Sequence, residues 1–230
     1  ALIAPVGGGR WRISLIFSTA ATETVTMRIR LLNDVGASTY TGDGGRGVYI
    51  GAGQLEAGDC PTSYIPTAGS TVTRAADVAQ VPLGAWWPGA AAGTLLVDFE
   101  CPPVSQLAMA AFFNSTSFMN SIGLSKSNAT NGSAGTHIVG SMYDGTPALS
   151  VPLDTGAAPG PHRAAMTWGG GTMRAAANGI LGAQVAQRNP VPTNFWLGQR
   201  DGGGLPLNGW LRRVSYWPRR MTDGELVGIT

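Results

Sequence analysis

Two carboxylates stand close together in the segment GTLLVDFE, residues 93 to 100. One residue separates Asp98 from Glu100, so in an extended strand both side chains would lie on the same face. Two carboxyl groups flanking a scissile bond are what glycoside hydrolysis requires. Here Cys101-Pro102-Pro103 ends the segment directly after the pair. A structural role for these carboxylates is therefore favoured over hydrolysis.

The other residue types that could do chemistry do not form a known constellation. His137 and His162 are the two histidines, and neither has the HExxH spacing of a zinc site. The chain has no GxSxG motif, and its triple-glycine tracts lack the following Lys of a phosphate-binding loop. We expect no catalytic residue and no metal ligand, and hence a protein that is not an enzyme.

Aromatic rings point to sugar binding, because the apolar face of a pyranose stacks on a ring while its hydroxyls need hydrogen-bond partners. The candidate ligand-binding residues are Trp86, Tyr143, Trp196, Asp201 and Trp210. Adjacent side chains of an extended segment point to opposite sides, so one of Trp86 and Trp87 should face outward. Packing inside the fold is the alternative role for most of these rings.

Charge and length narrow the functional classes. The formal net charge is +2 on 230 residues, and Lys126 is the only lysine. So small a charge excess gives little attraction for nucleic acid or an anionic membrane, and no apolar run reaches the length of a membrane span. Arg212, Arg213, Arg219 and Arg220 form a local cluster that we interpret as a solvated strand end and turn. Cys60 and Cys101 are expected to be free thiols of a protein folded in a reducing cytoplasm, and a disulfide between them is the alternative.

Period-2 alternation of apolar and polar residues runs through most of the chain. It predicts strands at 11–18 and 24–31, a third beginning at 48–52, and a further series within GTLLVDFE, LAMAAFF, FMNSIGL, THIVGSMY and HRAAMTW. Short strands between Gly, Asn, Pro and Ser turns are typical of an all-β antiparallel β-sandwich. At 230 residues, two such modules fit.

Three local signals are sharper. Asn178-Gly179 predicts a type I′ hairpin over residues 172–185. Leu211 and Val214 are three residues apart in WLRRVSYW, which breaks the alternation and predicts a bulge. Thr222 and Glu225 have the spacing of a capping box, which predicts a short helix at the end of the sequence.

Residues 41–78 carry a resemblance to a known architecture. The segments Gly53–Glu56, Pro61–Thr67 and Thr73–Asp77 resemble the end of a carbohydrate-binding-module-like jelly roll of tailed-phage structural proteins. In those proteins the extended PTSYIPT and TRAAD segments lead into a following domain. The resemblance implies a C-terminal part of such a module at 1–66 and a connecting strap at 67–77.

The rest of the chain, residues 78–230, resembles a concanavalin A-like, laminin-G-type sandwich. The features that carry it are GTLLVDFE, HRAAMTWGGGTMRAAANGILG, FWLGQ and LNGWLRRVSYWPRRMTDGELVGI. Glycosidases of this fold have a third acidic residue in an ExDxxE-type strand, which is missing here. Laminin-G-type sandwiches often hold calcium, for which Asp144 and Asp201 would be the ligands, but no dense Asp/Asn loop accompanies them. We therefore expect no cofactor, with calcium as the ion to test.

The first module departs from its pattern, because a jelly roll has about eight strands and only three or four can be found before residue 66. This implies that the chain is the C-terminal part of a longer polypeptide. Half a module would expose apolar strand faces and edges. We expect another segment or subunit to cover them.

Together the resemblances imply a virion structural protein of a tailed phage or phage-like particle: a fibre, spike or decoration protein that adheres to host cell-surface polysaccharide. Its expected partners are copies of itself, most simply in a trimer, and other virion proteins. It would be made in the bacterial host cytoplasm and would reside in the particle. The alternatives are a purely structural docking subunit that binds no glycan and, less favoured, a polysaccharide depolymerase.

Overall fold

The computed structural model describes residues 2–19, 24–45, 47–57, 61–73, 75, 77–101, 108–115, 120–127, 137–146, 148–153, 160–199 and 205–230. The chain divides into two units, Ala1–Thr73 and Arg74–Thr230. The division falls inside the segment 67–77 that the sequence marks as a strap. Each unit is described by itself.

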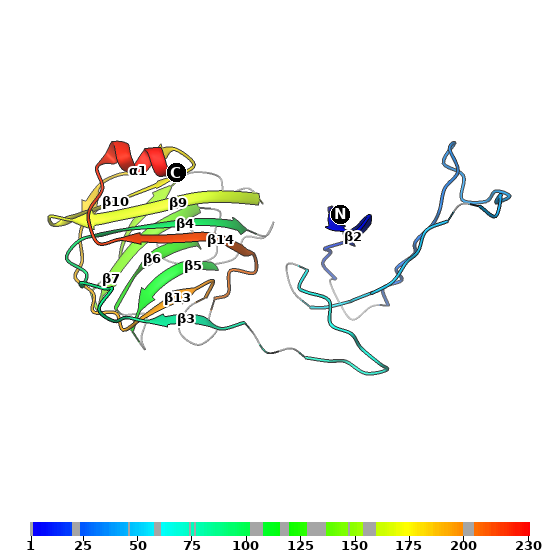
Figure 1. Ribbon diagram of the computed structural model, residues 1–230, viewed down its shortest axis with the longest axis horizontal. Helices are drawn as coiled ribbons and strands as arrows, with labels where there is room; N and C mark the ends of the chain where they lie inside the picture. The colour runs from blue at the N-terminus through cyan, green and yellow to red at the C-terminus, as the bar shows by residue number, and fades with distance from the viewer. Residues whose placement is uncertain are drawn as a thin grey trace. The chain divides into compact units, whose positions relative to one another are not determined.

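The second unit is an antiparallel β-sandwich with one short helix, as the alternation predicts (Figure 1). Its strands are β3 (Ala79–Pro82), β4 (Gly93–Cys101), β5 (Ala108–Asn114), β6 (Asn120–Ser127), β7 (His137–Asp144), β8 (Leu149–Leu153), β9 (Gly160–Gly169), β10 (Thr172–Ala177), β11 (Ile180–Leu181), β12 (Val185–Ala186), β13 (Asn194–Leu197) and β14 (Trp210–Trp217). The helix is α1 (Asp223–Ile229).

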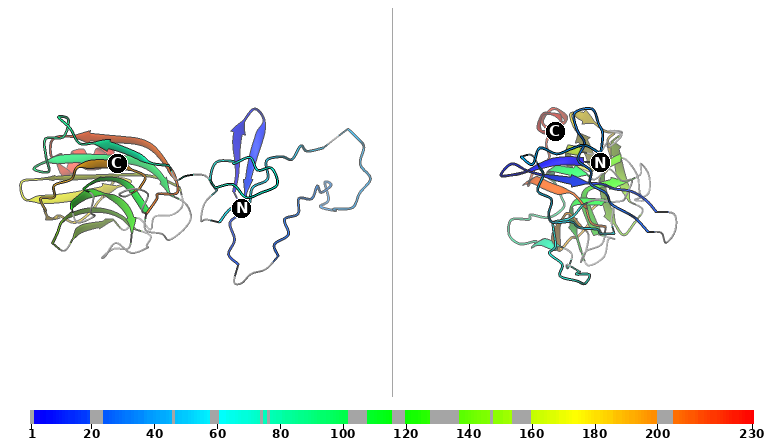
Figure 2. Two further views of the ribbon diagram at one scale, coloured as in Figure 1. Left: turned by 90° about the horizontal axis from the view of Figure 1, so that it is seen from below. Right: turned by 90° about the vertical axis from the view of Figure 1, so that its right-hand side faces the viewer.

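Two sheets make the two layers, which Figures 1 and 2 show from three sides. One has the strand order β11-β10-β9-β4-β14, with β12 also pairing with β10. The other has the order β3-β13-β5-β6-β7-β8. Neighbouring strands in both sheets are antiparallel. We call them the β4 sheet and the β6 sheet after a central strand of each.

The core lies between the sheets, and the alternation along β4 shows why. Leu95, Val97 and Phe99 are fully buried in the main core cluster, as the sequence predicts for one face of this strand. Leu96, between them, points to the opposite side of the β4 sheet and packs in a second cluster with Leu226 of α1. Helix α1 thus covers the outer face of this sheet next to β9 and β10 (Figure 1).

The predicted hairpin and bulge are both present. Asn178 and Gly179 have φ angles of 50° and 79°, the left-handed pair that a type I′ turn needs, and they join β10 to β11. In β14 the pairing with β4 shifts register between Leu211 and Arg213. Residue 212 is therefore the extra residue of a β-bulge.

Helix α1 begins with the predicted capping box. The Thr222 hydroxyl accepts from the Glu225 amide at 3.3 Å, and the Glu225 carboxylate accepts from the Thr222 amide at 2.8 Å. Arg219 also donates to this carboxylate, at 2.8 Å. These hydrogen bonds, first that from Arg219 and then those from Thr222, lower the pKa of Glu225 to about 2.

This shift predicts a pH dependence of stability. Because the folded pKa of Glu225 lies below its ordinary value of 4.5, the ionised cap contributes stability above about pH 4.5 and loses it as the pH falls toward 2. We expect wild type to unfold at a higher temperature than Glu225→Gln at pH 6, and the gap to close by pH 2. Thermal unfolding of both proteins at the two pH values measures this. A gap that is the same at both would contradict the cap's role.

The first unit differs from what its alternation predicts. In the described part of residues 2–73 the only sheet is the hairpin of β1 (Leu2–Gly7) and β2 (Arg10–Ser14). The strand expected at 11–18 is β2, which ends at Ser14 and pairs with β1 instead of with 24–31. The strands expected at 24–31 and 48–52 are wrong, because these segments have no pairing partner among the described residues.

Exposure in this unit has a different cause at the hairpin, because no second layer among the described residues covers its paired strands. Trp11 and Ile13 are each 64% exposed, where half-buried side chains are expected. Isolated two-stranded hairpins are marginally stable in water, because too little apolar surface is covered. That another segment or subunit covers these residues stays a prediction. Within the described residues, α1 is far too short to cross a membrane and no other helix could do so.

Candidate functional site

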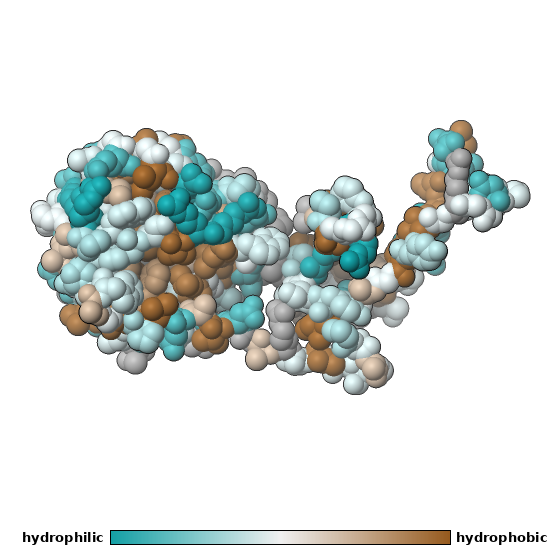
Figure 3. Space-filling view, viewed as in Figure 1, coloured by the Kyte–Doolittle hydropathy of each residue, from teal (hydrophilic) through white to brown (hydrophobic). Residues whose placement is uncertain are grey.

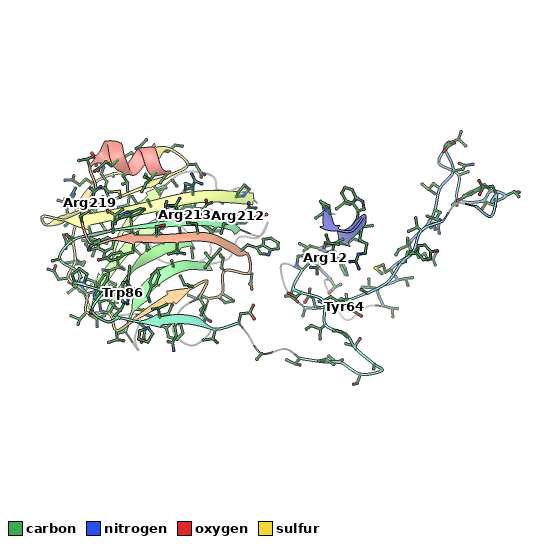
Figure 4. All side chains as sticks on the ribbon, in the orientation of Figure 1. Arg12, Tyr64, Trp86, Arg212, Arg213 and Arg219 are labelled. Carbon is green, nitrogen blue, oxygen red and sulfur yellow. The ribbon has the colours of Figure 1, made fainter. Side chains whose placement is uncertain are left out.

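The five residues proposed for ligand binding are spread over the second unit. Trp86 lies at one edge of the sandwich, in the connection between β3 and β4 (Figure 4). Tyr143 and Trp196 lie on the β6 sheet, on β7 and β13, and Trp210 is the first residue of β14. Asp201 lies outside the described residues. The described positions therefore do not converge on one site, and each has its own surroundings.

Trp86 is mainly a packing residue. Its ring contacts those of Phe113, Phe195 and Tyr216 at centroid distances of 6.2, 6.4 and 5.9 Å. It nevertheless remains 41% exposed, whereas its neighbour Trp87 packs against the core, 4.2 Å from the ring of Phe113. Both rings pack against Phe113 and Tyr216, and residue 86 lies in a turn, so the opposite orientation expected of an extended segment does not apply here. Figure 3 shows apolar atoms on this face over the region of β14, β5 and β13.

Tyr143 and Trp196 share the outer face of the β6 sheet but are too far apart to grip one small ring. Residues paired across the sheet run Asn194, Asn114, Ser121 and Tyr143, so three strand spacings, roughly 14 Å, separate β13 from β7. Trp196 is only 8% exposed. The indole N–H of Trp196 and the side-chain amide of Asn114 are buried without hydrogen-bond partners in the described part of the chain. A sugar cannot stack on so buried an indole in this conformation.

Trp210 is different, because its side chain is 58% exposed. It borders an open hollow of about 420 Å³, and the other described residues that line this hollow are Glu100, Leu211 and Arg212. Trp210 lies directly opposite Glu100 in the β14–β4 pairing. Arg212 donates to the Glu100 carboxylate at 2.8 Å, across the same hollow. A flat apolar ring beside a carboxylate and a guanidinium is the composition a sugar site needs. We call this the Trp210 hollow.

Backbone packing fixes the start of β14 beside Glu100. A Cβ at Gly209 would lie 2.0 Å from the backbone carbonyl oxygen of Glu100, so only glycine permits this approach. Leu207, two residues earlier, is buried in the main core cluster. The position of Trp210 is thus set by a buried anchor on one side and strand pairing on the other.

The outer face of the β4 sheet continues the site with a row of charges. Asp98 pairs in register with Arg213 of β14 and Arg163 of β9. Arg163 donates to Asp98 from Nη2 at 2.8 Å and from Nε at 3.3 Å. The two carboxylates that could suggest hydrolysis are therefore each ion-paired with an arginine, Asp98 with Arg163 and Glu100 with Arg212.

Calcium remains a prediction. Of its two expected ligands, Asp144 lies at the end of β7, and its carboxylate accepts from the Thr146 hydroxyl at 2.5 Å and from the Asn189 amide at 3.4 Å. The bond from Thr146 is the main cause that holds the pKa of Asp144 below its ordinary value. In the described part of the chain no three His, Cys, Asp or Glu side chains come together as a metal-binding group.

A second hollow, of about 460 Å³, lies in the first unit and is lined by residues between Gln54 and Val72. No aromatic ring is among the described residues that line it, and its polar side chains Gln54 and Glu56 form hydrogen bonds within the unit. Gln54 accepts from the Ile65 amide at 2.7 Å, and Glu56 accepts from the Thr62 amide at 2.7 Å. Burial raises the pKa of Glu56, but the hydrogen bonds from Thr62 outweigh it and lower the pKa. These groups hold their own segment together, so we favour the Trp210 hollow.

The arginines of β14 and the residues opposite them are the part of the site missing from the sequence-based candidates. The sequence shows Asp98, Glu100 and the arginine cluster as separate features. Only the cross-strand register, with its bulge at Arg212, brings them beside Trp210.

No protein-family model matches the chain, and no curated protein matches it in sequence. Several solved structures are similar to part of it. The Ruminococcus gnavus IT-sialidase CBM40 bound to α2,6-sialyllactose matches 62% of this chain and 84% of its own, at 18% identity and a TM-score of 0.49. Domains LG4-5 of the mouse laminin α1 chain match 64% of this chain and 40% of their own, at 9% identity and a TM-score of 0.47. The heptameric SAP-like pentraxin of Limulus polyphemus matches 61% and 70%, at 13% identity and a TM-score of 0.45. Likenesses this distant do not assign a function.

Proposed function

We propose that the second unit is a non-catalytic carbohydrate-binding module whose ligand stacks on Trp210. The observation that carries the proposal is the 58% exposure of this ring at the edge of an open hollow. The ring supplies the apolar plane, and Glu100 and Arg212 supply acceptor and donor groups for sugar hydroxyls. Open hollows suit one or a few sugar units of a long chain, since the chain can continue into solvent on both sides.

The charge pairing supports binding over hydrolysis. A general acid or a nucleophile must reach the sugar, whereas Asp98 and Glu100 are each held by the guanidinium of an arginine at 2.8 Å. A depolymerase thus stays the least favoured alternative.

The setting that we propose is the virion of a tailed phage or phage-like particle, as a fibre, spike or decoration protein. The resemblance of residues 41–78 to phage structural proteins supports it. A shallow single-ring site binds weakly, so adhesion to host cell-surface polysaccharide would depend on many copies acting together. Linked sites raise overall affinity without any new contact.

A purely structural docking subunit is the second candidate, and the first unit favours it. Large apolar side chains stand exposed there, among them Met27 at 68%, Val35 at 86% and Leu55 at 83%. So much exposed apolar surface is typical of a segment that is covered in an assembly. Its proposed partners are copies of the same chain, in a trimer, and other virion proteins.

Glycan binding by wild type and Trp210→Ala separates the candidates. We expect wild type to bind a subset of bacterial surface glycans on an array, and Trp210→Ala to weaken that binding at least ~10-fold, as the loss of a tryptophan hot spot does. Val191→Ala is the matched control, because it truncates an apolar side chain that is 73% exposed outside the hollow.

Two results would count against this function. If wild type binds no glycan, the structural candidate replaces the proposed one. If wild type binds and Trp210→Ala binds equally well, the sugar site lies elsewhere on the chain.

A further inference from the structure

The arginine cluster near the end of the sequence does not act as a unit. Arg219 pairs with Glu225 at the helix cap, and Arg220 donates to the carbonyl oxygens of Gly169 and Thr172. In Figure 4 Arg219 lies near one end of β14, while Arg212 and Arg213 lie together near the other. Arg219 and Arg220 therefore hold the chain's own turn, whereas Arg212 lines the Trp210 hollow and Arg213 follows it on the same strand.

Arg213 differs from its neighbour in having no carboxylate partner among the described residues. Arg212 is committed to Glu100 at 2.8 Å. The strand register places Arg213 opposite Asp98, but the Asp98 carboxylate is held from the other side by Arg163. The contact of Arg213 in this part of the chain is a bond from Nε to the Ser215 hydroxyl, at 3.1 Å. Its two terminal nitrogens are left to solvent or to a ligand.

The bulge brings Arg213 to the same face as Trp210. Residues three apart on a regular strand point to opposite sides of a sheet. Here the extra residue at 212 puts Trp210 and Arg213 on the same side of the sheet, since Trp210 pairs with Glu100 and Arg213 pairs with Asp98. Glu100 and Asp98 are two apart on β4 and share a face, at a separation of roughly 7 Å. Arg213 thus stands about one sugar ring away from Trp210.

Charge on this face favours an anion. Three guanidinium groups, those of Arg163, Arg212 and Arg213, face the two carboxylates of Asp98 and Glu100. Because both carboxylates are paired, the positive charge that is left among the described residues of this face belongs to Arg213. A guanidinium presents two parallel N–H groups that match the geometry of a carboxylate.

We propose that the Trp210 hollow selects acidic saccharides, with the sugar ring on Trp210 and the sugar carboxylate hydrogen-bonded to Arg213. This rests on the proposed function and names the ligand class of the same site. Arg213 is its specificity-determining residue, while Trp210 contributes to the binding of acidic and neutral sugars alike.

The test compares each acidic ligand with its own neutral form. A set of uronic-acid-containing oligosaccharides and their carboxyl-reduced counterparts is titrated into the full-length chain by calorimetry. We expect wild type to prefer the acidic form about 10-fold or more, the usual size of a charge-assisted hydrogen bond. The preference for the acidic form should become smaller when the salt concentration is raised from about 50 to about 500 mM. Salt screens exposed charge pairs, with a Debye length of ~10 Å at 0.1 M, so the attraction between Arg213 and the sugar carboxylate weakens.

Variants separate this inference from the function beneath it. Arg213→Gln should lower the affinity ratio of acidic to neutral ligand to about one and leave the affinity for the neutral ligand unchanged. Arg213→Lys should keep part of the preference for the acidic ligand, since a lysine retains the positive charge but lacks the two parallel N–H groups of a guanidinium. Arg28→Gln removes the same charge from the first unit and should leave the preference unchanged. Trp210→Ala should weaken both forms.

The outcomes are distinct. If no acidic form is preferred by wild type, or if Arg213→Gln keeps the preference, the acidic specificity is wrong while sugar binding at Trp210 stands. If Trp210→Ala changes the affinity for neither the acidic nor the neutral form, the proposed function itself is wrong.

Discussion

Trp168→Ala is expected to lower the free energy of unfolding of the second unit by about 3–5 kcal/mol, the cost of truncating a fully buried tryptophan. Trp168 is 0% exposed on β9 and contacts the rings of Phe113 and Tyr216 at 6.3 Å. Gly93 lies flat against the indole, since a Cβ there would come within 2.4 Å of it. Glycine and rigid rings on several sides cannot move in to fill the space, so a cavity remains. Chemical denaturation of the full-length chain measures the loss.

Trp210→Ala is the control for Trp168→Ala, because it makes the same substitution at an exposed ring of the same unit. We expect this control to change stability by less than about 1 kcal/mol, as exposed sites do. A loss for Trp168→Ala no larger than that of its control would contradict the packing of the core.

Gly209→Ala is expected to cost about 1–3 kcal/mol of stability, as overpacking does, and to abolish glycan binding as well. The added Cβ would stand 2.0 Å from the Glu100 carbonyl oxygen, which belongs to the backbone and cannot rotate away. Relief requires the start of β14 to move off β4. That movement separates Trp210 from Glu100, the pair that forms the hollow. Denaturation and calorimetry on the same preparation report both effects.

Gly224→Ala is the matched control, because it makes the same change where nothing lies within 4 Å. Gly224 is in helix α1, where alanine is favoured over glycine by roughly 0.5–1 kcal/mol, so this variant should be as stable as wild type or more so. Equal destabilisation by both variants would show that the close approach at Gly209 does not fix β14.

Local signals in the sequence predicted local structure well. The positive φ angles of Asn178 and Gly179, the Thr222 cap and the bulge after Leu211 all follow from the preferences of a few neighbouring residues. The burial of Leu95, Val97 and Phe99 follows from alternation. Each of these features is determined by the backbone within one turn or one strand.

Pairing between distant segments was not predictable in the same way. The alternation at 24–31 is as regular as that of GTLLVDFE, yet only the second becomes a strand, because β9 and β14 pair with it on both sides. Strand β8 and the β1 partner of β2 were not anticipated either. Alternation describes what a segment could pair with, and the partner decides whether it does.

The candidate site shows the same division. Exposure of an aromatic ring is a plausible guess for any tryptophan, but Trp196 is buried and Trp210 is exposed for reasons that depend on which strands lie beside them. The distinction between Arg212 and Arg213 depends on three strands at once. Asp98 is held from β9 and Glu100 from β14, so the ion pairs can be assigned only when the register is known.

The single inserted residue in β14 leaves Trp210 and Arg213 on the same outer face of that edge strand. Beyond it, Val214 and Tyr216 close the core, while before it Trp210 points away from the interior. The outward-facing side chains of this strand, Trp210 and Arg213, can therefore be exchanged with little penalty to folding, because Leu211, Val214 and Tyr216 are the ones that pack against the core. Substitutions at these outward-facing positions could change the ligand specificity and leave the core of the sandwich unchanged.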